Sequence, residues 1–342
     1  MIFKWEKSLS SEEMNLKETA DNIMLAGQIA AALEVSGYPK PGNVHRMSDQ
    51  RESRFEHFIV GSISIGPSIR RAAYRGALAA LHKIDLSEVG LGSLILEAAR
   101  SVKSWHRGGN THTGIILLFI PMASSASMSI IRYNDVDVHS FRRHFMEIMK
   151  ATTVKDAIDA CTAIVMSQSE NLGRVDNAPD LSSPNFKEKI IEVNYTLWDL
   201  MEISSRWDII ASELINALEL TLTVGYPTFI RVYGETEDIN TATVHTFLEL
   251  LSRVPDTLIA RKVGLKYTQE ISKAVPIGLK EAERISREAR KILELGGLMT
   301  DDGTRALKAL DQELKAKDLN PGSTADLTAA SIFYAMLSGF RF

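Results

Sequence analysis

Residues 107–123, RGGNTHTGIILLFIPMA, place polar side chains that could bind or protonate a ligand directly before an unbroken apolar run. Asn110 or Thr111 could cap the helix that follows, but a cap needs only one polar residue. His112 can transfer protons near neutral pH, and Gly108 and the glycine after it can let a ligand approach the backbone. We expect a buried helix that holds this polar cluster at a ligand.

A second stretch, EVSGYPKPGNVHRMSD at residues 34–49, combines two prolines and two glycines in a tight loop. A plain connection between two helices does not need so many ionisable groups, although a surface turn with incidental charges would have the same composition. The candidate residues are Glu34, Lys40, Asn43, His45, Arg46 and Asp49.

The third stretch, RVPDTLIARKVG at residues 253–264, has Pro255 and Asp256 where a helix can start. Arg261 and Lys262 follow more than one turn further along that helix. There they could bind phosphate or only contact water. On its own this stretch is therefore weak evidence for a phosphate site.

The fourth stretch, NPGSTADLTAASIF at residues 320–333, places Ser323 and Asp326 at the spacing of a capping box, with Asp in place of Glu. A cap is one interpretation. The other is an anion site, because free N–H groups at a helix start attract negative charge and Gly322 permits close approach. Thr324 lies in the same turn.

The elements that must position these four stretches are predicted to be helices. No regular alternation of strands and helices occurs, and the best strand candidate, TLTVGYPTFIRVYG at residues 221–234, stands alone, so we predict an all-α fold. Apolar residues recur at helical spacing near 11–35, 54–82, 87–105, 111–130, 139–168, 187–220, 240–254, 266–295, 301–317 and 324–338.

Composition argues against several classes of protein. The net charge is −4, and no Lys/Arg-rich block is interleaved with aromatic residues, so we expect no nucleic-acid partner. The N-terminus does not resemble a secretory signal, and the run Ile115–Ile120 is far shorter than a membrane span. The single cysteine, Cys161, cannot form an internal disulfide and is expected to be buried. We therefore expect a cytoplasmic protein with no membrane partner.

Common catalytic fingerprints are absent from the sequence. It contains no GxxxxGK[ST] phosphate loop, no CxxC or HExxH metal motif and no GxSxG nucleophile motif. A nucleotide site here would have to be built in another way.

Together the four stretches resemble the triphosphoribosyl-dephospho-CoA synthase family. Its members are similar in carrying a Glu before PKPG-x-V with an Asp shortly after, then G-x-NTHKG, then DTN followed by a basic pair, and finally PGGSADLLA. The matching residues are Glu34, 39–42, Val44 and Asp49; Gly108, Asn110, Thr111, His112 and Gly114; Asp256, Thr257 and Lys262; and Pro321, Gly322, Thr324, Ala325, Asp326 and Leu327.

The resemblance also bears on domain organisation. The segment GRVDNAPDLSSPN at residues 173–185 is predicted to be a loop, because it contains two prolines and several turn formers. Motifs on both sides of this loop belong to one family site. We therefore expect a single helical domain over residues 1–342.

The resemblance implies a transferase reaction. The 2′-hydroxyl of dephospho-CoA would attack the ribose C1′ of ATP, release adenine and keep the triphosphate, in a step of prosthetic-group biosynthesis that uses Mg²⁺. Asp49, His112 and Asp326 are the candidate catalytic residues, with Asp49 and Asp326 as bases or Mg²⁺ ligands. The nucleotide would be held by Glu34, Lys40, Asn43, His45, Arg46, Gly108, Asn110, Thr111, Asp256, Arg261, Lys262, Gly322, Ser323 and Thr324.

Departures from the family pattern leave two other functions open. Thr113 stands where the family has Lys, Leu258 where it has Asn, Val263 where it has Gly, and His45 where an Asp is common. One alternative is a related enzyme with a different acceptor, including water. The other is a non-catalytic nucleotide-binding protein, against which the retained carboxylates Asp49 and Asp326 argue. A homodimer is also left open.

Overall fold

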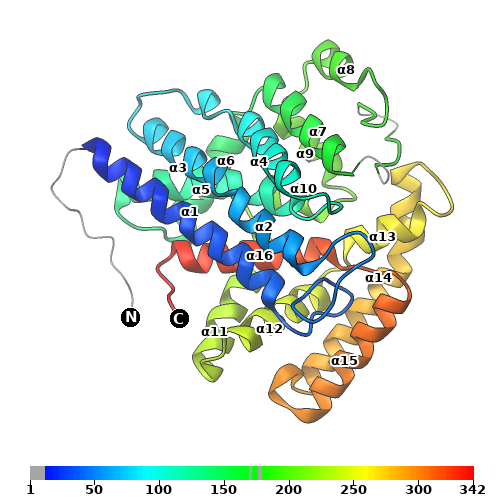
Figure 1. Cartoon of the computed structure of the whole chain (residues 1–342). Coiled ribbons are helices and arrows are strands. Elements are labelled where there is room, and N and C mark those ends of the chain that lie inside the picture. The colour runs from blue at the N-terminus through cyan, green and yellow to red at the C-terminus, as the bar shows by residue number, and fades with distance from the viewer. Residues whose placement is uncertain (1–11, 169–171, 176–178) are drawn as a thin grey trace.

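The computed structural model describes residues 12–168, 172–175 and 179–342, and these are built almost entirely from helices (Figure 1). Over these residues no strand occurs, so the all-α prediction is confirmed. The helices are α1 (Glu12–Ser36), α2 (Phe55–Ser64), α3 (Gly66–Ala80), α4 (Leu91–Trp105), α5 (Thr113–Tyr133), α6 (Val138–Lys150), α7 (Val154–Gln168), α8 (Phe186–Val193), α9 (Leu197–Ser204), α10 (Ile209–Ile215), α11 (Tyr226–Thr236), α12 (Ile239–Arg253), α13 (Thr257–Gly264), α14 (Ile271–Glu294), α15 (Asp301–Ala316) and α16 (Gly322–Leu337).

The predicted buried helix behind the polar cluster is α5. It contacts α1, α3, α4, α6 and α16, and its apolar run from Ile115 to Ile120 is buried on all sides. By length and composition α5 could cross a membrane, yet 89% of its most apolar window is buried inside the molecule, as in the core helix of a globular protein. Its first turn is therefore held in place by the core.

Two hydrophobic clusters make up the core. The larger one involves α1, α3 to α12 and α16, and Cys161 is buried in it. The smaller one lies among α12 to α15. Helices α12 and α16 contribute residues to both clusters, for example Leu327 to the larger and Ala325 to the smaller. The start of α16 thus lies where the two clusters meet.

The strand candidate at residues 221–234 is helical in the structure. This segment forms a π turn, Thr221–Gly225, followed by α11. The backbone N–H groups of Leu220 and Thr221 donate to the buried carboxylate of Glu213, both at 2.9 Å, which starts the helical turn. Pro227 lies in the first turn of α11, where its missing N–H costs nothing. Tertiary contacts therefore override the strand propensity of the β-branched and aromatic residues.

Three predicted helices are divided into shorter ones. The segment 54–82 breaks between α2 and α3, where Pro67 starts a new helix. The segment 139–168 forms α6 and α7, and the segment 187–220 contains α8, α9 and α10. The predicted loop at 173–185 is non-helical in its described residues, while residues 176–178 lie outside the described part.

Candidate functional site

Residues from all four polar stretches line one small cavity, here called the inner cavity, with a volume of about 50 Å³. Phe58 of α2 and Leu258 of α13 provide apolar wall, and Asn320 adds an amide. This volume admits only a few water molecules, so only a small part of a larger ligand could enter the cavity. The four stretches contribute Glu34 and Asn43, then Asn110, Thr111, Thr113 and Gly114, then Leu258, and finally Gly322, Ala325 and Asp326.

Asp326 lies against the first turn of α5. A Cβ atom on Gly114 would overlap the Asp326 carboxyl group, so only glycine permits this approach. Burial raises the pKa of Asp326 well above its usual value, and the nearby carboxylates of Glu34, Asp256 and Asp208 raise it further. A hydrogen bond from the backbone of Ile115 opposes this rise. The carboxyl group therefore tends to stay protonated, and a nearby positive charge would stabilise its ionised form.

Glu34 and Lys40 form a buried ion pair beside Asp326. Lys40 is fully buried, donates to Glu34 and also donates to Asn43 at 3.0 Å. Burial raises the pKa of Glu34 and lowers that of Lys40, and the attraction between the two charges opposes both shifts. Because Glu34 already neutralises much of its charge, Lys40 adds little net positive charge to the inner cavity.

A chain of amide side chains separates the inner cavity from a neighbouring outer cavity of about 250 Å³. Asn43 donates to Asn320 at 2.9 Å, and Asn320 donates to Gln50 at 3.0 Å. Gln50 in turn donates to the carbonyl of Gly42 at 2.8 Å. The outer cavity is lined by Gly42, Asp49, Gln50, Arg51, Lys315, Asp318 and Leu319.

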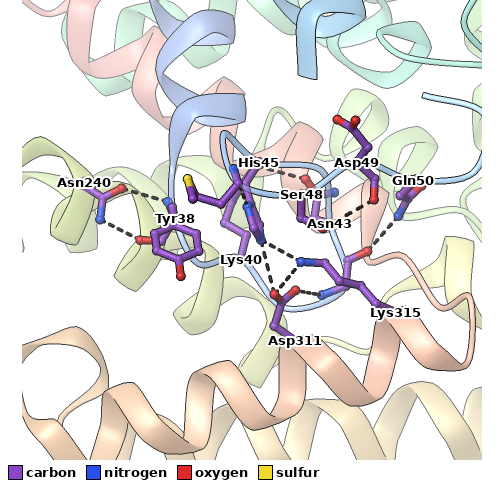
Figure 2. A network of polar contacts seen from close by, with 12 residues as sticks. Tyr38, Lys40, Asn43, His45, Ser48, Asp49, Gln50, Asn240, Asp311 and Lys315 are labelled. Atoms are coloured by element: carbon purple, nitrogen blue, oxygen red, sulfur yellow. Dashed lines mark hydrogen bonds and ion pairs between the residues drawn. The ribbon is translucent and has the colours of Figure 1, made fainter. Parts of the chain in front are cut away.

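Several charged residues of the loop between α1 and α2 hold that loop in place (Figure 2). His45 is buried and contacts Asp311 of α15 at 3.3 Å and Lys315 at 2.9 Å. Arg46 donates to the carbonyl of Ser36 at 2.6 Å and to Asn240 at 3.1 Å. Neither His45 nor Arg46 lines the inner cavity.

Asp49 is exposed, lines the outer cavity and accepts a hydrogen bond at 2.9 Å from the backbone N–H of Phe55, at the start of α2. The structure therefore does not bring Asp49 and Asp326 into one cavity. Over the described residues, no group of three or more His, Cys, Asp or Glu side chains is arranged to hold a metal ion.

The basic residues of the third stretch point away from the inner cavity. Arg261 lies 3.8 Å from Asp208, which caps α10. Lys262 pairs with Asp318 at 2.7 Å, and Asp318 lines the outer cavity. Lys262 is thus near the outer cavity, whereas Arg261 helps to hold α10 against α13.

Asp256, Ser323 and Thr324 connect helix starts. Asp256 is buried, caps α13 and accepts two hydrogen bonds from Thr324. Burial raises its pKa, which these hydrogen bonds oppose. Ser323 lies 3.4 Å from the hydroxyl of Thr257. These contacts place the fourth stretch next to the third.

The ring of His112 lies behind the cavity wall, not on its lining. It is 2% exposed, contacts the hydroxyl of Thr111 at 2.8 Å and packs on Phe58 with ring centroids 5.4 Å apart. Burial lowers the pKa of His112 to about 3, so the ring is neutral at physiological pH. The open side of Gly108, expected to admit a nucleotide, is occupied by the ring of His57.

The sequence did not single out Phe58, Gln50 or Asn320. Phe58 lies on the apolar face of a predicted helix and looks like an ordinary core residue. Asn320 immediately precedes Pro321 and reads as a turn residue. Only their long-range contacts reveal that they border the cavities.

The sequence model of the ATP:dephospho-CoA triphosphoribosyl transferase family matches residues 20–341. A 2-(5″-triphosphoribosyl)-3′-dephosphocoenzyme-A synthase from Escherichia fergusonii is 34% identical over 124 residues, which cover 35% of this chain and 35% of that protein. The corresponding synthase from Klebsiella pneumoniae is 35% identical over 111 residues, 32% of each chain. These two alignments span about a third of the length of the relatives.

Two further similarities extend over most of the chain. A Streptococcus equi subsp. equi protein named "Probable 2-(5″-triphosphoribosyl)-3′-dephosphocoenzyme-A synthase" is 23% identical over 330 residues, 94% of this chain and 98% of that protein. A crystal structure from Archaeoglobus fulgidus, described as a candidate triphosphoribosyl-dephospho-CoA synthase, aligns with a TM-score of 0.60 and 24% identity. It covers 84% of this chain and 100% of its own. The structural likeness shows a shared fold.

Proposed function

This chain belongs to the ATP:dephospho-CoA triphosphoribosyl transferase family, and we propose that it transfers the triphosphoribosyl group of ATP to the 2′-hydroxyl of dephospho-CoA with release of adenine. One observation carries the proposal: residues from the four motif-bearing stretches, which are up to 292 positions apart between Glu34 and Asp326, line the same cavity. The outer cavity does not combine residues from all four stretches.

In the proposed reaction the 2′-oxygen of the acceptor forms a bond to C1′ of ATP while the bond from C1′ to the purine nitrogen breaks. The hydroxyl proton passes to a carboxylate, and the departing purine must accept a proton or a hydrogen bond. Asp326 is the candidate base, because the other carboxyl group on the lining of the inner cavity, Glu34, is already paired with Lys40. The raised pKa of Asp326 makes its ionised form a strong proton acceptor.

Asn110 is the candidate donor to the purine. Its Oδ1 atom accepts hydrogen bonds from the hydroxyl of Thr113 at 2.6 Å and from the backbone N–H of Thr113 at 3.3 Å. This arrangement fixes the amide and leaves its amino group to donate. Phe58 and Leu258 provide apolar surface on which a purine or ribose could rest.

The carboxylates fit a Mg²⁺ ion bound together with ATP. Oxygen ligands suit Mg²⁺, and the excess negative charge around Asp326 and Glu34 would be relieved by a cation there. Asp49 lines the outer cavity, so it would not bind the same ion as Asp326 and would instead face a Mg²⁺ ion held there by the phosphates. When bound, Mg²⁺ would neutralise charge on the triphosphate.

The phosphates are assigned to the outer cavity. Lys315 and Arg51 line it, and Lys262 lies beside it through Asp318. Its volume of about 250 Å³ is five times that of the inner cavity, which leaves room for an extended charged group. We further propose a cytoplasmic location and one domain over residues 1–342. A homodimer stays a prediction.

The deciding experiment is incubation with ATP, Mg²⁺ and dephospho-CoA, followed by mass analysis. We expect free adenine and a product that carries the triphosphoribosyl group. Asp326→Asn should lower turnover by about 10²–10⁴-fold, the usual contribution of a general base. Adenine release without a dephospho-CoA adduct would instead indicate another acceptor or water, and ATP binding without any product would indicate a non-catalytic protein.

A second measurement tests nucleotide binding without turnover. ATP that binds only the folded state stabilises it by about 2.7 kcal/mol at 100 times the dissociation constant. The melting temperature should therefore rise with millimolar Mg²⁺-ATP. An unchanged melting curve would count against a nucleotide site.

A further inference from the structure

A row of hydrogen bonds behind the inner cavity includes His106, which none of the four motifs contains. The backbone N–H of Gly108 donates to Nδ1 of His106 at 3.1 Å. Nε2 of His106 lies 3.3 Å from the hydroxyl of Thr111, and that hydroxyl lies 2.8 Å from Nδ1 of His112. Thr111 lines the inner cavity. The row therefore passes through a residue of the cavity wall, Thr111, and ends on His112 behind it.

These contacts fix the tautomer of His106 when its ring is neutral, and one arrangement of protons on Thr111 and His112 continues the row. A backbone N–H can only donate, so Nδ1 of His106 must be an acceptor and its Nε2 must carry the proton. Nε2 of His106 then donates to Thr111, whose hydroxyl proton is left to point at Nδ1 of His112. His112 in turn carries its proton on Nε2, and a hydrogen bond between its ring and the backbone of Phe58 uses it.

His57, in the first turn of α2, packs against this row of hydrogen bonds. Its ring stacks on His106 with centroids 5.0 Å apart and planes 13° from parallel. The backbone N–H of Arg54 donates to Nδ1 of His57 at 3.1 Å, which fixes the ring as a cap on α2. Gly108 and Gly61 leave room for the rings of His57 and His112, respectively, because a Cβ on either glycine would overlap the facing ring.

We propose that His106 is a positioning residue, which fixes the rotamer of the Thr111 hydroxyl, and through it the ring of His112, at the wall of the inner cavity. The predicted effect of His106 on turnover rests on the proposed transferase function. The proton arrangement itself rests only on the contacts above.

Protonation of His106 would break the row. Nδ1 would then carry a proton that faces the N–H of Gly108, and two donors cannot pair. Burial and the neighbouring His57 lower the pKa of His106, which keeps the ring neutral near pH 7. The other ionisable groups around it are His112 at the start of α5, Glu52 beside Gly109, and Lys103 of α4, which donates to the carbonyl of Met166.

The first test reads the protons directly. Nitrogen NMR of the full chain labelled with ¹⁵N-histidine distinguishes the Nδ1–H and Nε2–H forms of neutral imidazole. We expect both His106 and His112 in the Nε2–H form at pH 7.5. His106 in the Nδ1–H form, or protonated at that pH, would overturn the proposal whether or not the protein is a transferase.

The second test measures turnover in variants. Gln in place of His106 can still donate from the position of Nε2, whereas Ala cannot. We expect His106→Ala and Thr111→Val to lower kcat about tenfold, the effect of one lost hydrogen bond, with KM for ATP nearly unchanged. His106→Gln and Thr111→Ser should recover most of kcat, and the exposed histidine variant His139→Gln should match the native protein.

The pH dependence separates positioning from packing. The native kcat should fall at acid pH as His106 is protonated, and this acid limb should be lost in His106→Gln. Equal losses in His106→Ala and His106→Gln, with an unchanged acid limb, would show that His106 only fills space. Absence of any turnover in the native protein would reject the transferase function. The NMR result alone would then show whether His106 and His112 carry their protons as proposed.

Discussion

Asp256 accepts hydrogen bonds from both the backbone N–H and the hydroxyl of Thr324, each at 2.8 Å. Its other carboxylate oxygen caps α13 through the N–H of Ile259 at 3.0 Å. One buried side chain thus ties together the starts of α13 and α16. Those two helix starts carry Leu258 and Asp326, on different sides of the inner cavity.

Replacement of Asp256 by Ala should separate these helix starts. Loss of the cap alone should lower the free energy of unfolding by about 1–2 kcal/mol, measured by urea denaturation. Affinity for Mg²⁺-ATP, measured by calorimetry, should fall as well. Asp238→Ala is the matched control, because Asp238 caps α12 through Thr241 on an exposed surface. A loss of affinity in the control equal to that in Asp256→Ala would contradict a specific role for Asp256.

Asp326→Asn should inactivate the protein and also stabilise it. The folded-state pKa of Asp326 is raised, so its ionisation above about pH 4 favours the unfolded chain and stability falls as the pH rises through the folded-state value. Asn removes that ionisation and can still accept the hydrogen bond from Ile115. The melting temperature at pH 7.5 should therefore exceed that of the native protein, and the difference should shrink toward pH 4. If Asp326→Asn is less stable than the native protein at pH 7.5, burial does not destabilise the ionised carboxylate in the folded state.

Gly61→Ala should displace the ring of His112, because the added methyl group would overlap it. We expect lower stability and lower turnover. The control is Gly234→Ala in α11, where a Cβ atom meets nothing within 4 Å. That variant should gain about 0.5–1 kcal/mol, the advantage of Ala over Gly in a helix, with turnover unchanged. If both variants gain stability, His112 is not tightly enclosed.

The buried pair of Glu34 and Lys40 should show strong coupling. Removal of one partner leaves an unpaired buried charge, so Lys40→Met should lower the free energy of unfolding by about 3–5 kcal/mol. The double variant Glu34→Gln/Lys40→Met should be more stable than Lys40→Met alone. Urea denaturation of all variants gives the interaction energy as a double-mutant cycle. Simple additivity of the two single effects would contradict a coupled pair.

The gathering of the four stretches was predicted from the resemblance to the family, in which the four motifs belong to one site, whereas turn chemistry marked only the helix ends. Glu34, Asn110 and Asp326 were named from local pattern and family resemblance, and they do line one cavity. The partners of His45 and Lys262 could not be predicted. Asp311 and Asp318 lie far along the chain, and a charged residue has the same local pattern whether it binds a ligand or anchors a loop.

Because α16 carries Asp326 and follows the other helices that line the inner cavity, this cavity has a consequence for biosynthesis. A nascent chain that ends before α16 holds Glu34, Asn110 and Leu258 but lacks the carboxyl group that faces α5. It also lacks the apolar residues that α16 gives to both parts of the core. The inner cavity therefore cannot form before α16 has been synthesised and has packed, and ribosome-bound chains that lack α16 should neither hydrolyse ATP nor transfer its triphosphoribosyl group.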